Sequence, residues 1–251
     1  MARYDFNAQR LFVEERLSAG AAVALDRDRS HYVAHVLRLK TGDAILLFNG
    51  RDGEWRARLR EVGKKGVALE AEEMIRAQTP APDVVYAFAP LKHARLDYMI
   101  QKAVEMGAAR LAPVITQHTQ VHRVNAERMR ANAIEAAEQC GVLHVPEVAP
   151  ETKLPRFLEA IAEDSLLVFC DEDAEIADPV AALRERRKNE SAASGLTLLI
   201  GPEGGFSADE RALILRRRNC ACISLGPRIL RADTAAVAAL TVAQIALGDW
   251  R

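Results

Sequence analysis

The sequence predicts an α/β protein in which a small β-rich domain precedes a larger domain with a mostly parallel sheet covered by helices. Short apolar strands separated by glycine-bearing turns occupy residues 1–74. A proline-bearing segment over 75–82 follows, and proline there prevents a strand or a helix from continuing. From residue 83 onward, apolar strands alternate with helical segments. The 251 residues, 49% hydrophobic and 27% charged, suffice for two such globular domains.

The first domain contains three segments with period-2 alternation or short apolar runs. The predicted strands are Ala44–Phe48, Trp55–Glu61 and Val67–Glu70. The residues between them, Asn49–Gly53 and Gly63–Gly66, are typical of hairpin turns. Short strands at this spacing predict a small barrel or sandwich, and Arg29–Leu39 has the pattern of one helix lying across it.

The second domain alternates strands and helices up to the C-terminus. The predicted elements are the strand Val84–Ala89, a helix to Met106, the strand Leu111–Ile115, the helix Ala126–Cys140, the strand Leu166–Cys170, a helix to Arg187, the strand Leu196–Ile200, a helix to Arg218, the strand Cys222–Leu225 and a helix to Leu247. Gly107 and Gly141 stand where left-handed residues end helices. Asn125 is a candidate helix cap, and Ser207–Glu210 has the sequence of a capping box.

Charge and cysteine content narrow the class of protein. No apolar core of signal-peptide length follows Met1, and no apolar run approaches the ~20 residues of a membrane span, so we expect a soluble cytoplasmic protein. The four cysteines show neither CxxC spacing nor a histidine cluster nearby, which indicates reduced structural thiols and no metal site. Because the net charge is −1, any nucleic-acid site must be local. The basic runs 184–188 and 216–218 are each typical of a solvated helix face.

Two glycine-bearing loops follow successive predicted strands. Residues 198–207, LLIGPEGGFS, pass from a buried strand through a glycine-rich turn into a capped helix, and residues 224–234, SLGPRILRADT, lead into the last helix. Ligands of open α/β sheets bind at the carboxyl ends of strands, so both loops are expected at one ligand-binding edge. The first loop lacks the spacing of a phosphate loop, which argues against a nucleoside triphosphate. For this loop alone, a plain strand–turn–helix junction is the alternative interpretation.

The two loops carry a family resemblance. GPEGGFS followed by LGPRILRADTA resembles the SPOUT superfamily of knotted methyltransferases, and within it the RsmE-type family of 16S ribosomal RNA uridine-N3 methyltransferases. The segments RLFV, HYVAHVLRLKTGD, KHARLDYMIQKAVEMG and AAEQCG look like family features in the same order, so the resemblance covers essentially the whole chain.

The resemblance implies both a fold and an activity. The fold would be a PUA-like RNA-binding β-barrel over residues 1–74, a linker over 75–82 and a SPOUT domain over 83–251 whose C-terminal chain forms a deep trefoil knot. The activity would be methylation of N3 of a specific uridine in the 16S rRNA of the small ribosomal subunit. S-adenosyl-L-methionine would be the methyl donor, no metal would be needed, and the working form would be a homodimer.

The resemblance also assigns cofactor-binding positions. They are Phe169, Ile200, Gly201, Gly204, Leu225, Gly226, Ile229 and Leu230. Backbone groups of these loops would hydrogen-bond to the adenine and ribose, while the apolar side chains enclose the base.

Methyl transfer to uridine N3 requires the loss of a weakly acidic proton or stabilisation of the anion that forms. We therefore hypothesise that Arg231 stabilises this anion or positions RNA, and that Asp233 orients Arg231 or accepts the proton. A carboxylate is a poor base for so weak an acid. The alternative role of Asp233 is that of a helix-start residue compensating the helix dipole.

RNA contacts are expected from a group of basic side chains. These are Arg10, Arg38 and Lys40 in the first domain and Lys92, Arg95 and Lys102 in the second. Each one alone is typical of a solvated surface cation. His31 and His35 are four residues apart on a predicted helix, but no third metal ligand is visible, which favours a structural role.

The chain departs from the family pattern at two positions. Asp233 replaces a glutamate and keeps the charge, whereas Val142 replaces the arginine that ends the family's AEQxGR segment. The second change removes a cation from a segment expected to face RNA or the partner subunit.

Two other functions remain open from the sequence. One is a non-catalytic RNA-binding protein with a degenerate knot, against which the intact GPEGG and ILRAD segments argue. The other is a SPOUT enzyme acting on transfer RNA, which shares the cofactor loops but usually lacks the N-terminal barrel.

Overall fold

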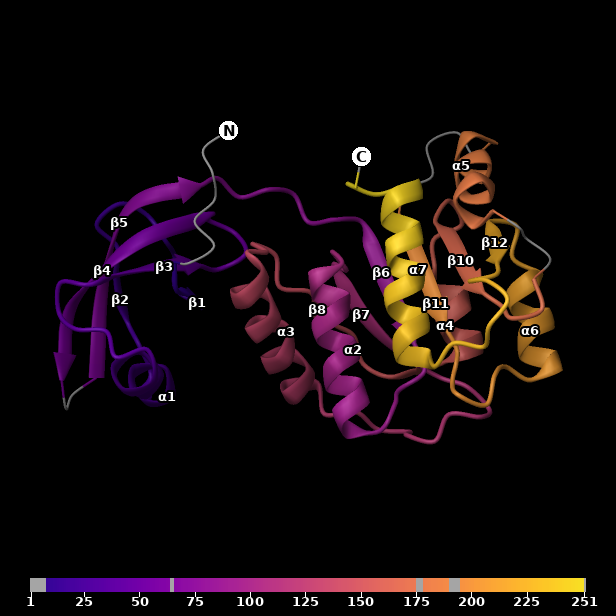
Figure 1. Ribbon diagram of the computed structural model, residues 1–251, viewed down its shortest axis with the longest axis horizontal. Coiled ribbons are helices and arrows are strands. Elements are labelled where there is room, and N and C mark those ends of the chain that lie inside the picture. Colours follow the sequence, from indigo (N-terminus) through magenta and orange to yellow (C-terminus); the bar gives the residue numbers. More distant parts are fainter. Residues whose placement is uncertain (1–7, 64–65, 175–177, 190–194, 251) are drawn as a thin grey trace. The chain divides into compact units, whose positions relative to one another are not determined.

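The computed structural model describes residues 8–63, 66–174, 178–189 and 195–250, which form two compact units (Figure 1). The first unit contains Met1–Pro80 together with Ala137–Val145. The second contains Ala81–Ala136 and Pro146–Arg251. The first unit is therefore not one continuous segment of the chain. Residues 137–145 belong to it, although the helix that leads into them begins in the second unit.

The first unit is built on a five-stranded sheet. Its elements are β1 (Arg10–Phe12), β2 (Ala22–Ala24), α1 (Arg27–His31), η1 (Tyr32–Val36), β3 (Ala44–Phe48), β4 (Glu54–Gly63) and β5 (Gly66–Arg76). The strand order is β1-β3-β4-β5-β2, with β1 parallel to β3 and the remaining pairs antiparallel. Alternate residues such as Leu47, Leu59 and Leu69 meet in one apolar core, as the period-2 pattern predicts.

The helix predicted over Arg29–Leu39 is present but has another form. A short α-helix, α1, passes directly into one π-helical turn, η1, in which the Leu37 N–H donates to the Tyr32 carbonyl. Arg38 then adopts a left-handed conformation, with φ 57°, and the Leu39 N–H donates to the Val33 carbonyl. Arg38 therefore ends the helix in the position that glycine usually occupies.

The second unit contains a parallel sheet, as predicted. Its elements are β6 (Val84–Phe88), α2 (His93–Glu105), β7 (Arg110–Ile115), α3 (Ala126–Cys140), β8 (Glu147–Val148), β9 (Thr152–Lys153), α4 (Leu154–Ala160), β10 (Leu166–Cys170), α5 (Pro179–Asn189), β11 (Leu196–Ile200), α6 (Ala208–Leu215), β12 (Cys220–Ile223) and α7 (Ala232–Ala246). The order β12-β10-β11-β6-β7-β8, with β9 beside β7, is parallel throughout.

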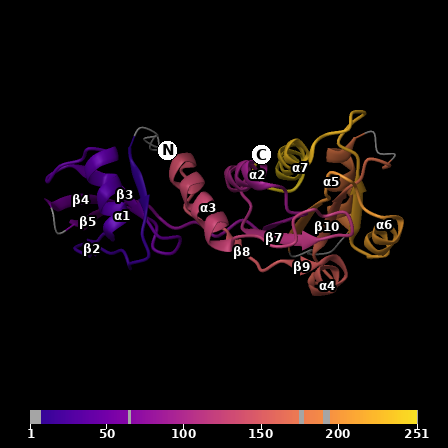
Figure 2. The same ribbon diagram turned by 90° about the horizontal axis from the view of Figure 1, so that it is seen from below.

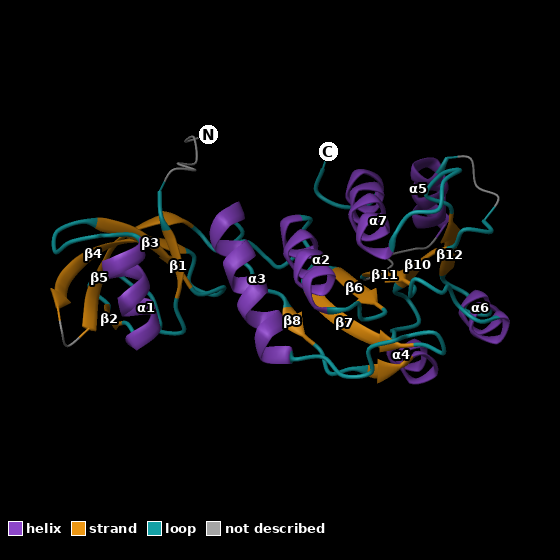
Figure 3. Ribbon diagram, turned by 60° about the horizontal axis from the view of Figure 1, so that its bottom comes forward, coloured by secondary structure: helices purple, strands orange, loops and turns teal. Residues whose placement is uncertain are grey.

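Helices cover both faces of this sheet (Figures 2 and 3). On one face, Ala87, Phe169 and Leu199 form a core with residues of α4 and α6. Figure 3 shows α2, α5 and α7 on the opposite face, where α7 packs against both of the others. None of the helices in the described part of the chain has the length and apolar character that crossing a membrane requires.

Several predicted helix boundaries are confirmed by their caps. Gly107 and Gly141 have φ values of 81° and 72°, and the Asn125 side chain accepts a hydrogen bond from the Arg128 N–H. The helix predicted to reach Arg218 ends earlier, at Leu215. The Arg217 guanidinium donates to the Leu158, Ile161 and Ala162 carbonyls around the end of α4, so residues 216–218 are not simply a solvated helix face.

Candidate functional site

The two glycine-bearing loops begin at the same edge of the parallel sheet, as predicted. Strand β10 lies between β11 and β12 and pairs in parallel with both. The residues that follow β11 and β12 therefore leave the sheet at its carboxyl edge, where open α/β sheets bind ligands. We call residues 201–207 the first loop and residues 224–231 the second loop.

The first loop is tightly packed around its glycines. A Cβ atom at Gly201 would lie 2.5 Å from the ring of Phe206. Gly205 has a φ of 69°, and its N–H donates to the Pro202 carbonyl over 2.9 Å. The predicted capping box is confirmed, since Ser207 Oγ accepts from the Glu210 N–H and Glu210 Oε2 accepts from the Ser207 N–H. The loop therefore has a defined backbone path into α6.

Two other segments contact the first loop, namely helix α2 and the residues that follow β7. Arg95 on α2 forms an ion pair with Glu203. After β7, the Gln117 N–H donates to Glu210 Oε1 over 2.8 Å, and His118 Nδ1 lies 3.1 Å from the carbonyl oxygens of both Gly204 and Gly205. Neither Glu203 nor His118 was singled out from the sequence, because their partners lie 86 or more residues away in the chain.

The second loop is open and exposes an apolar side chain between two arginines, Arg228 and Arg231. Gly226 has a φ of 106°, and a Cβ atom there would meet nothing within 4 Å. Its N–H lies 3.3 Å from Ser224 Oγ, so the loop starts with a local turn. The Ile229 side chain is 87% exposed. Leu225 and Leu230 are each partly buried. An exposed apolar side chain beside an open glycine is suited to covering a flat aromatic group.

Two of the predicted cofactor-binding residues, Phe169 and Ile200, are buried. Phe169 is 1% exposed and packs edge-to-face against Phe206, with ring centroids 5.3 Å apart. Its side chain therefore supports the first loop from beneath, and a contact of this residue with the cofactor stays a prediction. Ile200 is also buried, and its carbonyl already accepts a hydrogen bond from the Ala89 N–H.

The predicted catalytic residues stand at the start of α7. Arg231 is the N-cap residue, with an exposed side chain that makes no capping hydrogen bond. Asp233 lies in the first helical turn and accepts a hydrogen bond from the Thr234 N–H over 2.8 Å. Among the described residues no ion pair links Arg231 with Asp233, so the structure does not support the hypothesis that one orients the other. The position of Asp233 agrees with the helix-start role.

A buried aspartate, Asp171, lies directly after β10 and beside β12. Asp171 accepts hydrogen bonds from Arg211 Nε at 2.7 Å and from the Cys222 thiol at 3.5 Å. Burial, reinforced by Asp171, raises the pKa of Cys222 to about 12, and the hydrogen bond to Asp171 raises the pKa of Arg211. The thiol therefore stays protonated at neutral pH and acts as a hydrogen-bond donor, not as a nucleophile. No group of three or more potential metal ligands occurs among the described residues.

Comparison with known proteins identifies the family. The model of the RNA methyltransferase domain family matches residues 78–244, and that of the RNA methyltransferase PUA domain matches residues 25–72. The chain is 33% identical to the ribosomal RNA small subunit methyltransferase E of Rickettsia conorii, over 95% of both chains. It is 31% identical to the protein of the same name from Synechocystis, over 93% of this chain and 76% of that one. The chain belongs to the ribosomal RNA small subunit methyltransferase E family.

Solved structures agree with this assignment. The methyltransferase E of Neisseria gonorrhoeae bound to S-adenosyl methionine has a TM-score of 0.81 and 26% identity, covering 97% of this chain and all of that one. A methyltransferase from Legionella pneumophila, in complex with bound S-adenosyl methionine, has a TM-score of 0.80 and 28% identity over 94% of this chain and 97% of that one. The α/β fold and the PUA-like N-terminal region are those of methyltransferase E proteins.

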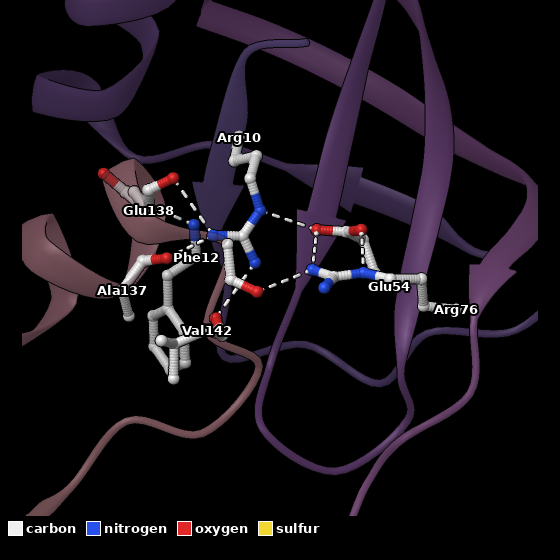
Figure 4. Close-up of polar contacts among 8 residues, drawn as sticks. Arg10, Phe12, Glu54, Arg76, Ala137, Glu138 and Val142 are labelled. Carbon is white, nitrogen blue, oxygen red and sulfur yellow. Dashed lines mark hydrogen bonds and ion pairs between the residues drawn. The ribbon is translucent and has the colours of Figure 1, made fainter. Parts of the chain in front are cut away.

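Arg10, which we predicted to contact RNA in this methyltransferase, is buried. Its side chain is 3% exposed, and its Nε donates to Glu54 over 2.6 Å (Figure 4). The two terminal nitrogens donate to the carbonyls of Ala137, Glu138 and Val142. All of its nitrogens thus have partners within the first unit, so the prediction of an RNA contact is corrected to a structural role.

The backbone of the segment with Val142 is bound to the first unit. Its carbonyls accept hydrogen bonds from Arg10 and from Arg76, which donates to Gly141 over 2.9 Å. Whether its side chains face RNA or a partner subunit stays a prediction. Arg76 also donates to Glu54, whose carboxylate is fully buried between the two guanidinium groups (Figure 4). The replacement of the family's arginine by valine therefore falls in a segment whose backbone is attached to the first unit.

The remaining predicted RNA contacts divide into two groups. Arg38, Lys40 and Lys92 are exposed, and no ion pair of theirs occurs among the described residues. Arg95 is paired with Glu203, and Lys102 with Glu105 at 2.6 Å, so their charges are compensated.

His31 and His35 are both exposed, with ring centroids 4.7 Å apart, close to Arg38 in the chain. The structural role expected for this pair stays a prediction.

Proposed function

We propose that this protein transfers a methyl group from S-adenosyl-L-methionine to N3 of a specific uridine in 16S rRNA of the small ribosomal subunit. The single observation that carries the proposal is the presence, in a chain of the methyltransferase E family, of two glycine-bearing loops at one carboxyl edge of the sheet. Both solved relatives described above are bound to this cofactor.

The residues of the two loops fit the cofactor. Gly201 leaves no room for a side chain and Gly204 leaves little, so both keep side-chain atoms out of the first loop, while the exposed Ile229 offers an apolar surface for adenine. Gly226 adds open space in the second loop. Backbone groups of the loops would bind the adenine and ribose, and Leu225 and Leu230 would complete the enclosure of the base.

The bound cofactor supplies an activated methyl group on a sulfonium centre. The protein then has to align the uridine and stabilise the negative charge that develops on its imide. Arg231 suits this task because its exposed guanidinium stands at the N-terminus of α7, where the helix dipole also favours negative charge. Asp233 remains the candidate proton acceptor in this proposal, and its carboxylate accepts a hydrogen bond from the Thr234 N–H.

RNA would bind through those predicted cations that are exposed and lack acidic partners. In the first unit they are Arg38 and Lys40, which follow the π-helical turn, and in the second unit Lys92, which precedes α2. By contrast, Arg56, Arg58 and Arg60 on β4 pair with glutamates of β5, which makes that face of the sheet nearly neutral. The segment 32–40 is therefore the RNA-contacting part of the first unit in this proposal.

The finer features of the fold belong to the proposal as well. The five-stranded sheet of the first unit would act as a PUA-like barrel, and the chain leading into α7 would pass through a trefoil knot. The partly exposed Tyr98, Ile245 and Trp250, on or after the packed helices α2 and α7, support a homodimer. Its place of action would be the bacterial cytoplasm, where small subunits are assembled.

The proposal is tested by nucleoside mass spectrometry. The protein is incubated with S-adenosylmethionine and small ribosomal subunits that lack their native modifications. We expect 3-methyluridine at one position of 16S rRNA. A different methylated nucleoside would contradict the uridine-N3 specificity but keep a methyltransferase. Cofactor binding without methylation would favour a transfer RNA substrate or a non-catalytic RNA-binding protein.

The role of Arg231 is tested by Arg231→Ala, with Arg216→Ala as a control outside both loops. We expect Arg231→Ala to abolish turnover and leave cofactor affinity within about twofold, since Arg231 would act on the uridine and not on the cofactor. Arg216 is exposed at the end of α6, and its substitution should change neither quantity. Single-turnover methylation by Arg231→Ala at the wild-type rate would exclude the proposed role.

A further inference from the structure

His118 lies in the segment after β7 and contacts the first loop. Its Nδ1 is 3.1 Å from the carbonyl oxygens of both Gly204 and Gly205. Carbonyl oxygens only accept hydrogen bonds, so Nδ1 must carry the proton and donate it. The contact therefore selects one tautomer of the neutral ring and leaves the lone pair on Nε2.

The segment that carries His118 is itself held in place. The Thr116 N–H donates to Thr119 Oγ1 over 2.9 Å, and the two hydroxyl groups are 2.8 Å apart in the buried interior. The Gln117 N–H is bound to Glu210, which is the same side chain that caps α6. The position of the imidazole is thus determined by β7 on one side and by the start of α6 on the other.

The contact determines how the peptide groups of the first loop are oriented. In a planar trans peptide the N–H points opposite to the carbonyl. The peptide between Gly204 and Gly205 has its carbonyl on His118 and its N–H on the Pro202 carbonyl, so both of its polar ends are occupied. The Gly205 carbonyl also faces His118, so the N–H of Phe206 points away from the imidazole.

We propose that His118 is a positioning residue for the cofactor, which acts by holding the backbone of the first loop through its Nδ1 proton. The inference rests on the proposed function, because it takes the first loop to bind S-adenosylmethionine. Gly204 and His118 are also packed closely together, since a Cβ atom added at Gly204 would lie 3.3 Å from the His118 Cβ. Loss of the Nδ1 donor frees two carbonyls and lets this glycine-rich backbone sample other conformations.

Two amide substitutions test the inference because they place a donor at different distances from Cα. In His118→Asn the side-chain amide nitrogen replaces Nδ1, whereas in His118→Gln it reaches toward the position of Nε2. Titration calorimetry with S-adenosylmethionine should show about a tenfold higher Kd for His118→Gln, from the loss of a shared hydrogen bond. His118→Asn should bind within about twofold of the wild type, by the same estimate.

The matched control is His122→Gln, which changes another exposed histidine of the same connecting segment. It should leave the Kd unchanged. The KM for S-adenosylmethionine should follow the Kd in all variants, while kcat at saturating cofactor and the melting temperature stay at wild-type values. A purely structural role of His118 would instead lower the melting temperature of both His118 variants alike.

The outcomes separate this inference from the proposed function. Equal Kd values for His118→Gln and the wild type, or equally weak binding by His118→Asn and His118→Gln, would overturn the role of Nδ1 alone. Failure of the wild-type protein to bind S-adenosylmethionine would overturn the proposed function and this inference with it. A second measurement, the nitrogen NMR spectrum of the imidazoles, should show His118 protonated on Nδ1 at neutral pH when the ring is uncharged.

Discussion

Arg38 combines a strained backbone with an exposed charge. It is the one residue other than glycine with a positive φ among the described residues, and it follows a π-helical turn. Left-handed backbone costs an ordinary residue roughly 1–2 kcal/mol, and π-helical turns occur often at functional sites. An arginine in a position suited to glycine therefore agrees with a role for its side chain in binding RNA.

We predict that Arg38→Gly separates the effect of the left-handed backbone from the effect of the exposed charge. The substitution relieves the left-handed strain, so the free energy of unfolding should stay the same or rise by less than about 1 kcal/mol. RNA affinity should fall, and the slope of log K against log salt concentration should decrease by about 1. The matched control is Arg60→Ala, since Arg60 is already paired with Glu70. An RNA affinity of Arg38→Gly equal to that of the wild type would count against the proposed surface.

The cysteines should differ in reactivity according to their surroundings. Burial raises the pKa of Cys220 to about 11 and that of Cys222 to about 12, and raises the pKa of Cys170 still further. Because the thiolate is the reactive form, a raised pKa lowers the reactive fraction at any given pH. Cys140 is exposed at the end of α3. In native protein at pH 8, a disulfide reagent should modify Cys140 first, and the other three thiols only after unfolding. Rapid modification of all four would contradict this prediction.

At the scale of elements, the junction of β11, the first loop and α6 depends on two aromatic rings. Phe169 on β10 packs against Phe206, and Phe206 in turn fills the space beside Gly201. The capping box at Ser207 then starts α6 directly after the ring. The strand, the loop and the helix therefore share one packing arrangement, and a change at Gly201 affects all three.

We predict that Gly201→Ala weakens cofactor binding. The new Cβ would lie 2.5 Å from a ring that is already packed, so the loop backbone must shift. Overpacking of this kind costs roughly 1–3 kcal/mol, which corresponds to a Kd for S-adenosylmethionine at least about fivefold higher. Gly63→Ala is the control, because a Cβ there meets nothing within 4 Å and the residue lacks a positive φ. Titration calorimetry measures both variants, and equal Kd values would exclude the packing argument.

At the scale of the whole molecule, a buried ion cluster determines which segments form the first unit. Glu54 is fully buried between Arg10 and Arg76, and both arginines bind backbone carbonyls of residues 137–142. The Phe12 N–H adds a hydrogen bond to Glu138 from the same segment. A stretch of chain distant in sequence is thereby joined to the sheet of the first unit (Figure 4).

We predict that Glu54→Gln destabilises the protein much more than a comparable change at the surface. Removing one partner of a buried ion pair costs about 3–5 kcal/mol, because the remaining charge stays buried without compensation. Glu72→Gln removes a carboxylate from the more exposed pair with Arg58 and should cost far less, because solvent screens that pair. Urea unfolding compares the two, and equal effects would show that the cluster is not the main attachment of residues 137–145.

The order and type of most helices and strands could be predicted because local patterns specify them. The ranges of β3, α3, β10 and β11 agree with the predicted ones, since the boundaries of their apolar segments are unambiguous in the sequence. The strands β1, β2, β8 and β9 and the helix α4 were missed because they are short and owe their form to neighbouring strands and helices. The shared edge at which the two glycine-bearing loops begin could be predicted for the same reason as the parallel sheet, since the strands before both loops end there.

By itself, the sequence determined the α/β class, the glycine-bearing loops and the family to which they belong, because each of these is encoded by neighbouring residues. Only the tertiary structure decided that Arg10 is buried on Glu54 and that Phe169 lies beneath the first loop. The same holds for His118, whose Nδ1 meets a backbone 86 residues away. Burial and hydrogen bonding depend on which distant segments come into contact, and these contacts cannot be derived from the spacing of residues along the sequence.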